Sequence, residues 1–128
     1  DVFVYDVKNG TKIQTLIVKN PPVQLIGTES QLVVATGSSV QTWCYGGDDQ
    51  EWKLAYVLDV KDLRRIFAPN DHLLGIVTND RFSIYRNREL LSQTKQTNVY
   101  TMSDQYIIYG DGSVCTCCIT RKISFVMI

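Results

Sequence analysis

The sequence predicts an all-β fold, a β-propeller of about three and a half four-stranded blades. The first observation is a recurring pair, in which an apolar residue is followed three positions later by another bulky residue. The pairs are Val2 and Tyr5, Val40 and Trp43, Phe82 and Tyr85, and Val114 and Cys117. The second observation is that they recur about every 32 to 42 residues, close to the roughly 40 to 45 residues of one blade. Turns rich in Gly, Ser, Asn and Asp separate the alternating segments around each pair.

The first unit, residues 1–19, is expected to be half a blade. Its two strands are Val2 to Tyr5 and Ile13 to Ile17, in which apolar side chains alternate between the two faces. Asn9-Gly10 between them favours a type I′-like turn with positive φ. Asn20-Pro21-Pro22 ends the unit, because proline has no amide hydrogen to donate to a neighbouring strand.

The next three units, residues 20–59, 60–95 and 96–128, are each expected to form a four-stranded blade. The expected strands of the second unit are Val23 to Gly27, Gln31 to Thr36, Val40 to Tyr45 and Lys53 to Leu58. Those of the third are Leu63 to Phe67, His72 to Val77, Phe82 to Tyr85 and Glu89 to Thr94. Those of the fourth are Asn98 to Met102, Tyr106 to Tyr109, Val114 to Ile119 and Lys122 to Ile128.

These units make an incomplete arc, because propellers close with about four to eight blades. An open arc leaves sheet edges and one blade face uncovered, and native proteins cover such edges. We therefore expect the remaining propeller segments, or another chain, to complete the arc. Asp1 to Asp6 also resembles the middle of a strand without an initiator Met or a leader, so we expect residues to precede it in the protein.

Two stretches of the sequence resemble the WD40-type propellers. Phe67 to Tyr85 resembles the passage in which an aromatic residue and a Pro-Asp-Gly turn lead into an apolar strand, an Asp turn and a strand ending in Trp. Val2 to Gly10 resembles the Trp-Asp strand and its turn, with Tyr5-Asp6 in place of Trp-Asp. The kelch pattern fits less well, because Gly46-Gly47 follows the third strand of its blade and not the second. The WD40 resemblance implies a non-catalytic protein–protein interaction scaffold, a subunit of an intracellular multiprotein complex.

Composition narrows the functional classes. Thirteen Lys and Arg balance thirteen Asp and Glu, so the chain lacks the positive field of a dedicated nucleic-acid binder. The sequence contains no apolar run of the roughly 20 residues that span a bilayer. His72 is the only histidine and has no recognisable nucleophile motif, so we expect no catalytic residues and no cofactor. An alternative is that the chain is part of a propeller enzyme whose site lies outside this segment.

The cysteines are interpreted as small apolar residues. Cys115 and Cys117 fall on one face of an expected strand and Cys118 on the other, so these three cannot jointly ligate a metal. We expect no metal site and a reducing, intracellular compartment, cytoplasmic or nuclear. Asn9-Gly10-Thr11 also fits the acceptor pattern for N-glycosylation, and the sequence leaves open whether Asn9 is ever modified.

Two groups of residues are candidates for binding. Trp52, with Asp48 and Asp49 in the adjacent turn, is a candidate anchor for a protein partner, whereas Trp43 is expected in the core. Arg64 and Arg65 are the alternative candidate, for phosphate or lipid, because some propellers that bind phosphoinositides carry a paired arginine in a blade. Ile66 follows this pair where those propellers have glycine, and a solvated charged face is the simpler interpretation.

Overall fold

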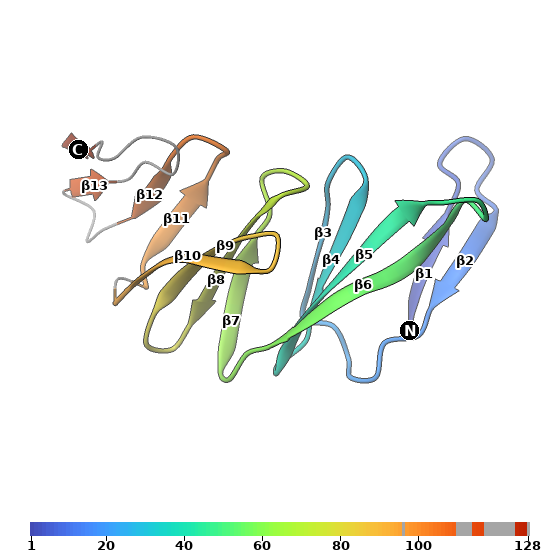
Figure 1. Ribbon diagram of the computed structural model, residues 1–128, viewed down its shortest axis with the longest axis horizontal. Helices are drawn as coiled ribbons and strands as arrows, with labels where there is room; N and C mark the ends of the chain where they lie inside the picture. Colours follow the sequence, from blue (N-terminus) through green and yellow to red (C-terminus); the bar gives the residue numbers. More distant parts are fainter. Residues whose placement is uncertain (96, 110–113, 117–124, 128) are drawn as a thin grey trace.

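The computed structural model of the chain describes residues 1–95, 97–109, 114–116 and 125–127. These residues form antiparallel β-sheets that follow one another along the long axis of the molecule in sequence order (Figure 1). Within the described ranges, no helix is long and apolar enough to cross a membrane. The arrangement is a row of stacked sheets, as expected for successive blades.

The first sheet has two strands and the next two sheets have four each. The first sheet pairs β1 (Val2–Tyr5) with β2 (Lys12–Leu16). The second has the order β3 (Gln24–Gly27), β4 (Gln31–Ala35), β5 (Ser39–Gly46), β6 (Glu51–Asp59). The third has the order β7 (Leu63–Phe67), β8 (Leu73–Thr78), β9 (Phe82–Arg86), β10 (Glu89–Thr94). Two hairpins follow, β11 (Val99–Met102) with β12 (Ile107–Tyr109) and β13 (Val114–Thr116) with β14 (Phe125–Met127).

The strands predicted for the first three units are confirmed to within two residues at each end. Alternation and turn residues are local signals, so they locate strands without knowledge of the neighbours. In the fourth unit, residues 110–113, 117–124 and 128 lie outside the described residues. Cys117 and Cys118, and the side chain of Cys115, fall in this part, so the interpretation of the cysteine cluster stays a prediction.

The first hairpin turn differs from the expected type I′-like turn. In this turn only Gly10 has a positive φ, of 72°, and Asn9 does not. The Asp6 carboxylate accepts hydrogen bonds from the amides of Lys8 and Asn9 at 2.7 and 3.3 Å, and the Gly10 amide donates to the Asp6 carbonyl at 2.8 Å. The turn is wider because the Asp6 side chain satisfies backbone donors within the loop.

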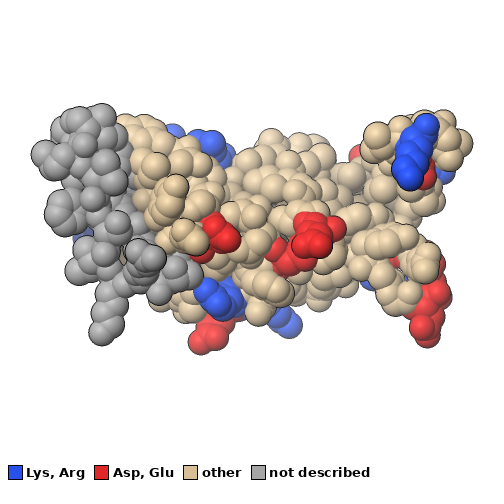
Figure 2. All heavy atoms as spheres, turned by 90° about the horizontal axis from the view of Figure 1, so that it is seen from above, with Lys and Arg blue, Asp and Glu red and all other residues tan. Residues whose placement is uncertain are grey.

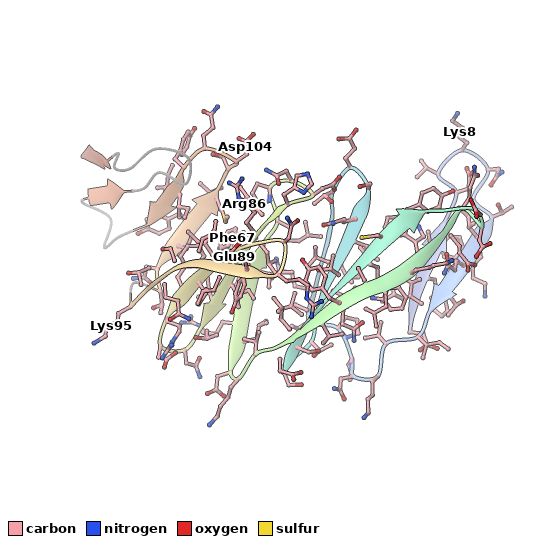
Figure 3. All side chains as sticks on the ribbon, viewed as in Figure 1. Lys8, Phe67, Arg86, Glu89, Lys95 and Asp104 are labelled. Carbon is pink, nitrogen blue, oxygen red and sulfur yellow. The ribbon has the colours of Figure 1, made fainter. Side chains whose placement is uncertain are left out.

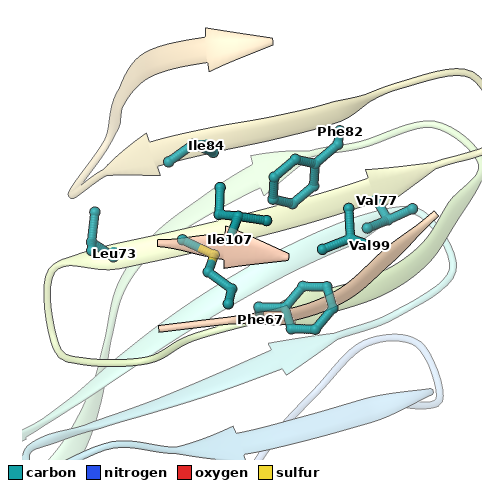
Figure 4. Packing of buried hydrophobic residues seen from close by; sticks show 8 residues of the cluster. Phe67, Leu73, Val77, Phe82, Ile84, Val99 and Ile107 are labelled. Atoms are coloured by element: carbon teal, nitrogen blue, oxygen red, sulfur yellow. The ribbon is translucent and has the colours of Figure 1, made fainter. Parts of the chain in front are cut away.

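Apolar side chains fill the spaces between successive sheets. The first cluster joins the first and second sheets and contains Val2, Leu16, Val18, Val34 and Trp43. The second joins the second and third sheets and contains Val33, Ala35, Val40, Ile66, Leu74 and Ile76. The third joins the third sheet to β11 and β12 and contains Phe67, Leu73, Val77, Phe82, Ile84, Val99, Met102 and Ile107 (Figure 4). The expectation that Trp43 belongs to the core is confirmed.

The third sheet shows why the core is divided. All six residues of β8 are buried, and their side chains alternate between the two faces. Leu74 and Ile76 enter the second cluster, whereas Leu73 and Val77 enter the third. A sheet that is apolar on both faces needs a neighbour on each side, so the stability of each sheet depends on the next.

Gly75 lies at a close contact between the third sheet and β11. A Cβ atom at this position would lie 2.7 Å from the Met102 sulfur and 3.0 Å from the Phe82 ring. We predict that Gly75→Ala lowers the free energy of unfolding by about 1 to 3 kcal/mol, because the added methyl group overpacks the third cluster. Chemical denaturation at neutral pH measures this change.

Gly27→Ala is the matched control for this prediction. Gly27 is also a strand residue, but no atom lies within 4 Å of the position of an added Cβ. Its substitution should leave stability within about 0.5 kcal/mol of the unmodified protein. Equal effects of the two substitutions would contradict the packing described here.

Candidate functional site

The turns between strands are sorted onto two rims because consecutive strands are antiparallel (Figure 1). Figure 3 shows Lys8, in the turn after β1, and Asp104, in the turn after β11, at the upper rim, and Lys95, after β10, at the lower rim. Basic and acidic side chains are interspersed on the face seen in Figure 2. On the described part of this face, therefore, positive and negative side chains alternate, and no large region carries charge of one sign.

The outer face of the first sheet is an apolar surface without a cover. Phe3 and Tyr5 of β1 are each 55% exposed, and Ile13 of β2 is 58% exposed. The register pairs Phe3 with Thr15, so alternation places these three side chains on the same face. We call Phe3, Tyr5 and Ile13 the outer apolar face.

The opposite face of the same hairpin is buried. Val2 and Leu16 are 8% and 1% exposed and pack against Val34 and Trp43 of the second sheet. The first sheet is thus apolar on both faces, like the sheets that follow it, and only one of its faces is covered. The Lys12 ammonium lies 5.3 Å from the centre of the Phe3 ring, which leaves the face apolar with a single positive charge at its margin.

The edge of β1 is also open. In the described part of the chain, β1 pairs with β2 and with no other strand, whereas the corresponding strands β5 and β9 each have a neighbour on both sides. An edge strand carries backbone donors and acceptors that can pair with an added strand. The open edge and the outer apolar face therefore belong to the same incomplete sheet.

Glutamine side chains connect neighbouring sheets through backbone groups. The Gln24 amide of β3 donates to the Ile66 carbonyl at 3.0 Å and accepts from the Ile66 amide at 2.8 Å. Gln14 of β2 makes the same two-way pairing with Trp52 of β6, both bonds at 2.8 Å. Each glutamine satisfies a donor and an acceptor that the adjacent sheet leaves free, which fixes the separation of the sheets.

A carboxylate connects the second and third sheets at the upper rim. Asp71, in the turn before β8, accepts hydrogen bonds from the Ser30 amide at 3.0 Å and the Ser30 hydroxyl at 2.6 Å. It also accepts one from the Thr28 hydroxyl. The hydrogen bonds from Ser30 and Thr28 lower the pKa of Asp71 below its ordinary value.

The predicted partner anchor occupies a structural position. Trp52 is half-buried against the first cluster, its ring lies 5.4 Å from that of Tyr45, and its backbone is held by Gln14. Asp48 and Asp49 are exposed in the adjacent turn, where Asp49 pairs with the Lys53 ammonium at 2.9 Å. A role in partner binding for Trp52, Asp48 and Asp49 stays a prediction.

The predicted arginine pair lies on β7. Both side chains are exposed and line a cleft of about 300 Å³ with Thr97, Asn98 and Tyr100. The Arg65 guanidinium stacks 4.4 Å from the centre of the Phe67 ring and approaches the Val99 carbonyl at 3.5 Å. Arg65 therefore connects the third sheet to β11, and Arg64 is the member of the pair without such a contact in the described structure.

The inter-sheet contacts follow the repeat. The contacts of Gln24 with Ile66, of Gln14 with Trp52 and of Asp71 with Ser30 join residues that are 42, 38 and 41 positions apart. These separations match the spacing of the recurring pairs. The spacing of polar residues one repeat apart could therefore have indicated hydrogen bonds between neighbouring sheets. Sequence reasoning missed these contacts because glutamine and aspartate are also common in solvated turns.

The described residues contain no group of three or more His, Cys, Asp or Glu side chains placed to hold a metal ion. Cys44 is a free thiol on β5, half-buried and contacted by the Gln31 amide at 3.7 Å. His72 lies in an exposed turn with Asn87 3.4 Å from its ring nitrogen. These groups lie apart from the outer apolar face.

Solved structures that are similar to the chain include Hsv2 from two Kluyveromyces species. Hsv2 of Kluyveromyces marxianus superposes with a TM-score of 0.60 at 14% identity, over 85% of this chain and 40% of that one. Hsv2p of Kluyveromyces lactis superposes with a TM-score of 0.54 at 17% identity, over 77% of this chain and 33% of that one. Both are β-propellers. The chain has a β-propeller fold.

The predicted fold class is thereby confirmed, with the described strands forming an incomplete arc of blades. This chain spans 40% and 33% of the lengths of the two propellers. No protein-family model matches the chain, and no curated protein of similar sequence was found. We call the two-stranded first sheet the half-blade and the four-stranded second and third sheets blades.

We predict that Asp71→Asn destabilises the protein at neutral pH, because the neutral amide accepts weaker hydrogen bonds from Ser30 and Thr28. The folded-state pKa of Asp71 is lowered, so its stabilising effect is complete above the ordinary pKa of about 3.9 and is lost as the pH falls through the folded-state value. The stability difference between the two proteins should shrink between about pH 5 and pH 2.

Urea denaturation across this pH range measures the difference. Asp48→Asn, in an exposed turn, is the matched control and should change stability little at any pH. A difference for Asp71→Asn that does not depend on pH would contradict the contact between its carboxylate and the second blade.

Proposed function

We propose that the protein is a non-catalytic protein–protein interaction scaffold, a WD40-like propeller subunit of an intracellular multiprotein complex. The observation that carries this proposal is the outer apolar face of the half-blade, with the open edge of β1 beside it. Three large apolar side chains more than half exposed on one sheet face favour contact with another polypeptide.

The occupant that fits this face is a propeller blade. Each interface between blades in the chain joins two apolar sheet faces, and the half-blade presents the same kind of face. The similar propellers are also more than twice as long as this chain, so their arcs contain further blades. We propose that a four-stranded blade covers Phe3, Tyr5 and Ile13. The polypeptide that supplies this blade also supplies strands that pair with β1.

The construction of the arc supports a scaffold role. Side-chain amides and a carboxylate join the blades through hydrogen bonds to fixed backbone groups, so the rims move little relative to one another. A rigid support lets rim loops bind a partner at a low entropic cost. On this proposal, the loops of the described blades supply the partner sites.

We predict that Phe3→Glu combined with Ile13→Glu abolishes co-purification of the polypeptide that completes the arc, because each substitution buries an unpaired carboxylate in the new interface. The double variant should still fold, since both side chains already face solvent. Affinity purification of the intact protein, with quantification of the bound polypeptides, measures the loss. Light scattering distinguishes a second copy of this chain from a different polypeptide.

The matched control is Lys8→Glu combined with Thr11→Glu, in the exposed turn of the same hairpin. These substitutions add negative charge to the half-blade without touching the outer apolar face. Retained co-purification in the Phe3 and Ile13 variant would refute the docking of a blade on this face. Unfolding of that variant, seen as lost β-structure in circular dichroism, would show instead that the side chains are structural.

A second candidate function is membrane recruitment through phosphoinositide headgroups at the arginine cleft. The observation that favours it is the arrangement of Arg64 beside Thr97, Asn98 and Tyr100, which supplies a charged donor and polar side chains in one cleft. Arg65 contributes less, because its guanidinium already stacks on Phe67.

We predict that Arg64→Ala lowers sedimentation of the protein with liposomes that contain phosphoinositide, and leaves stability unchanged because Arg64 is exposed. The combined Arg64→Ala and Arg65→Ala variant should bind no more than the single variant, while losing some stability. Arg86→Ala, at the end of β9, is the control. Equal sedimentation of all these proteins would exclude this candidate.

A further inference from the structure

The second and third blades enclose a cleft of about 320 Å³ towards the lower rim. It lies between the β6–β7 connection and the strands β8, β9 and β10. Its lining residues are Asp59, Val60, Lys61, Asp62, Ile76, Thr78, Asp80, Arg81, Ser83, Tyr85 and Gln93. None of the sites discussed above uses this cleft.

Ser83 is a buried polar residue that opens into the cleft. It is only 5% exposed, and within the described structure its hydroxyl has no hydrogen-bond partner. Every side-chain nitrogen or oxygen that is sealed from solvent in the described structure has a partner, so the Ser83 hydroxyl must face the open space of the cleft. A hydroxyl that opens into a cleft and has no protein partner is available to donate a hydrogen bond to a ligand or to accept one from it.

The preceding blade provides an internal comparison. Gln41 on β5 occupies the position of Ser83 on β9, since each lies two residues before an aromatic residue, Trp43 or Tyr85, that packs between blades. The side-chain oxygen of Gln41, Oε1, accepts a hydrogen bond from the Trp43 indole N–H at 3.0 Å. In the third blade the small Ser83 makes no such bond, and space remains where the longer side chain would lie.

The charged residues of the cleft fall into two groups. Asp80 accepts hydrogen bonds from the Thr78 hydroxyl at 3.0 Å and from Arg81 at 3.4 Å, which together lower its pKa. Arg81 also donates to Gln93 at 3.4 Å. These residues already satisfy one another at the turn between β8 and β9.

The second group has no partner within the described structure. Asp59 and Asp62 make no ion pair or side-chain hydrogen bond in the described structure, and Lys61 is the only other charge on the same connection. The carboxylates therefore outnumber the ammonium group in the part of the cleft that is free to bind. Either carboxylate can accept a charge-assisted hydrogen bond from an incoming cation.

The remaining lining suits the stem of a long basic side chain. Val60, Ile76 and Tyr85 provide apolar and aromatic surface beside the carboxylates and the Ser83 hydroxyl. The methylene groups of such a side chain pack on apolar surface while its charged end reaches polar groups. Arginine fits better than lysine, because its planar guanidinium presents donors to several acceptors at once.

We propose that this cleft binds an arginine side chain of a partner polypeptide. A second hollow of about 430 Å³ adjoins it, shares Asp80, Arg81 and Gln93, and ends at Lys95, which points away from the sheet (Figure 3). The joined depressions suit an extended segment with an arginine in the cleft. This inference rests on the proposed scaffold function and names the chemistry of one partner site.

The experiment uses the intact protein and two short probes, acetyl-Gly-Arg-Gly-amide and the same peptide with citrulline in place of arginine. Citrulline keeps the shape of the side chain and removes its charge. The arginine peptide should cause saturable shifts of the backbone amide resonances of Asp59, Asp62 and Ser83, with at least about tenfold weaker binding of the citrulline peptide.

Three variants test the assignment. Asp59→Asn combined with Asp62→Asn should weaken binding of the arginine peptide at least about tenfold, whereas Glu89→Gln combined with Asp104→Asn, at two exposed positions outside the cleft, should not change it. Ser83→Gln should block the cleft by restoring the longer side chain of the preceding blade. The melting temperature of each variant is measured, and the Asp59 and Asp62 variant is decisive because both residues are exposed.

Equal binding of the two peptides, unchanged binding by the Asp59 and Asp62 variant, or the absence of saturable shifts would each overturn the proposal. These outcomes would leave intact the co-purification that depends on Phe3 and Ile13. The failure of this site can therefore be distinguished from the failure of the scaffold function.

Discussion

The whole structure depends on one constraint: its sheets are apolar on both faces and must be covered on both sides. The six buried residues of β8 show this most clearly. Leu74 and Ile76 pack against the second sheet, whereas Leu73 and Val77 pack against β11 and β12. No blade has a core of its own, and burial of apolar surface is achieved only between neighbours. The half-blade obeys the same rule on its inner face and leaves Phe3, Tyr5 and Ile13 in solvent on the other, which is the face that we propose a further blade covers.

Polar contacts add specificity to this stacking. Gln14 and Gln24 each pair with both backbone groups of a residue in the next blade, and Asp71 holds the loop of Thr28 and Ser30. Apolar contact alone allows sheets to slide or rotate, whereas hydrogen bonds to fixed backbone groups admit one arrangement. Where one of these interface side chains is short, as at Ser83, the stack leaves a cleft between two blades. The interfaces that hold the arc together therefore also contain the site that we propose for a partner's arginine.

Much of the fold was predictable because its signals are local. Alternation and turn residues located the strands of the first three units, and the spacing of Val40 and Phe82 indicated that successive sheets repeat. The candidate sites were less predictable. Trp43 lies in the core as the sequence indicated, but Trp52, the candidate surface anchor, also packs against the first cluster, and Arg65 approaches Val99 where a solvated charge was the simpler interpretation. In each case a residue about one repeat away decides the environment, and a single sequence does not show how two side chains meet there.

The sequence by itself determined that the chain is all-β and that its strands recur in units of about the length of one blade. Backbone conformation is set by neighbours in the chain, so a linear pattern contains this information. Only the tertiary structure decided which polar side chains join the blades, that the face of Phe3 stays exposed, and that Ser83 leaves a cleft beside two free carboxylates. These features depend on the sizes of side chains that face each other across an interface, and that pairing exists only once the sheets have stacked.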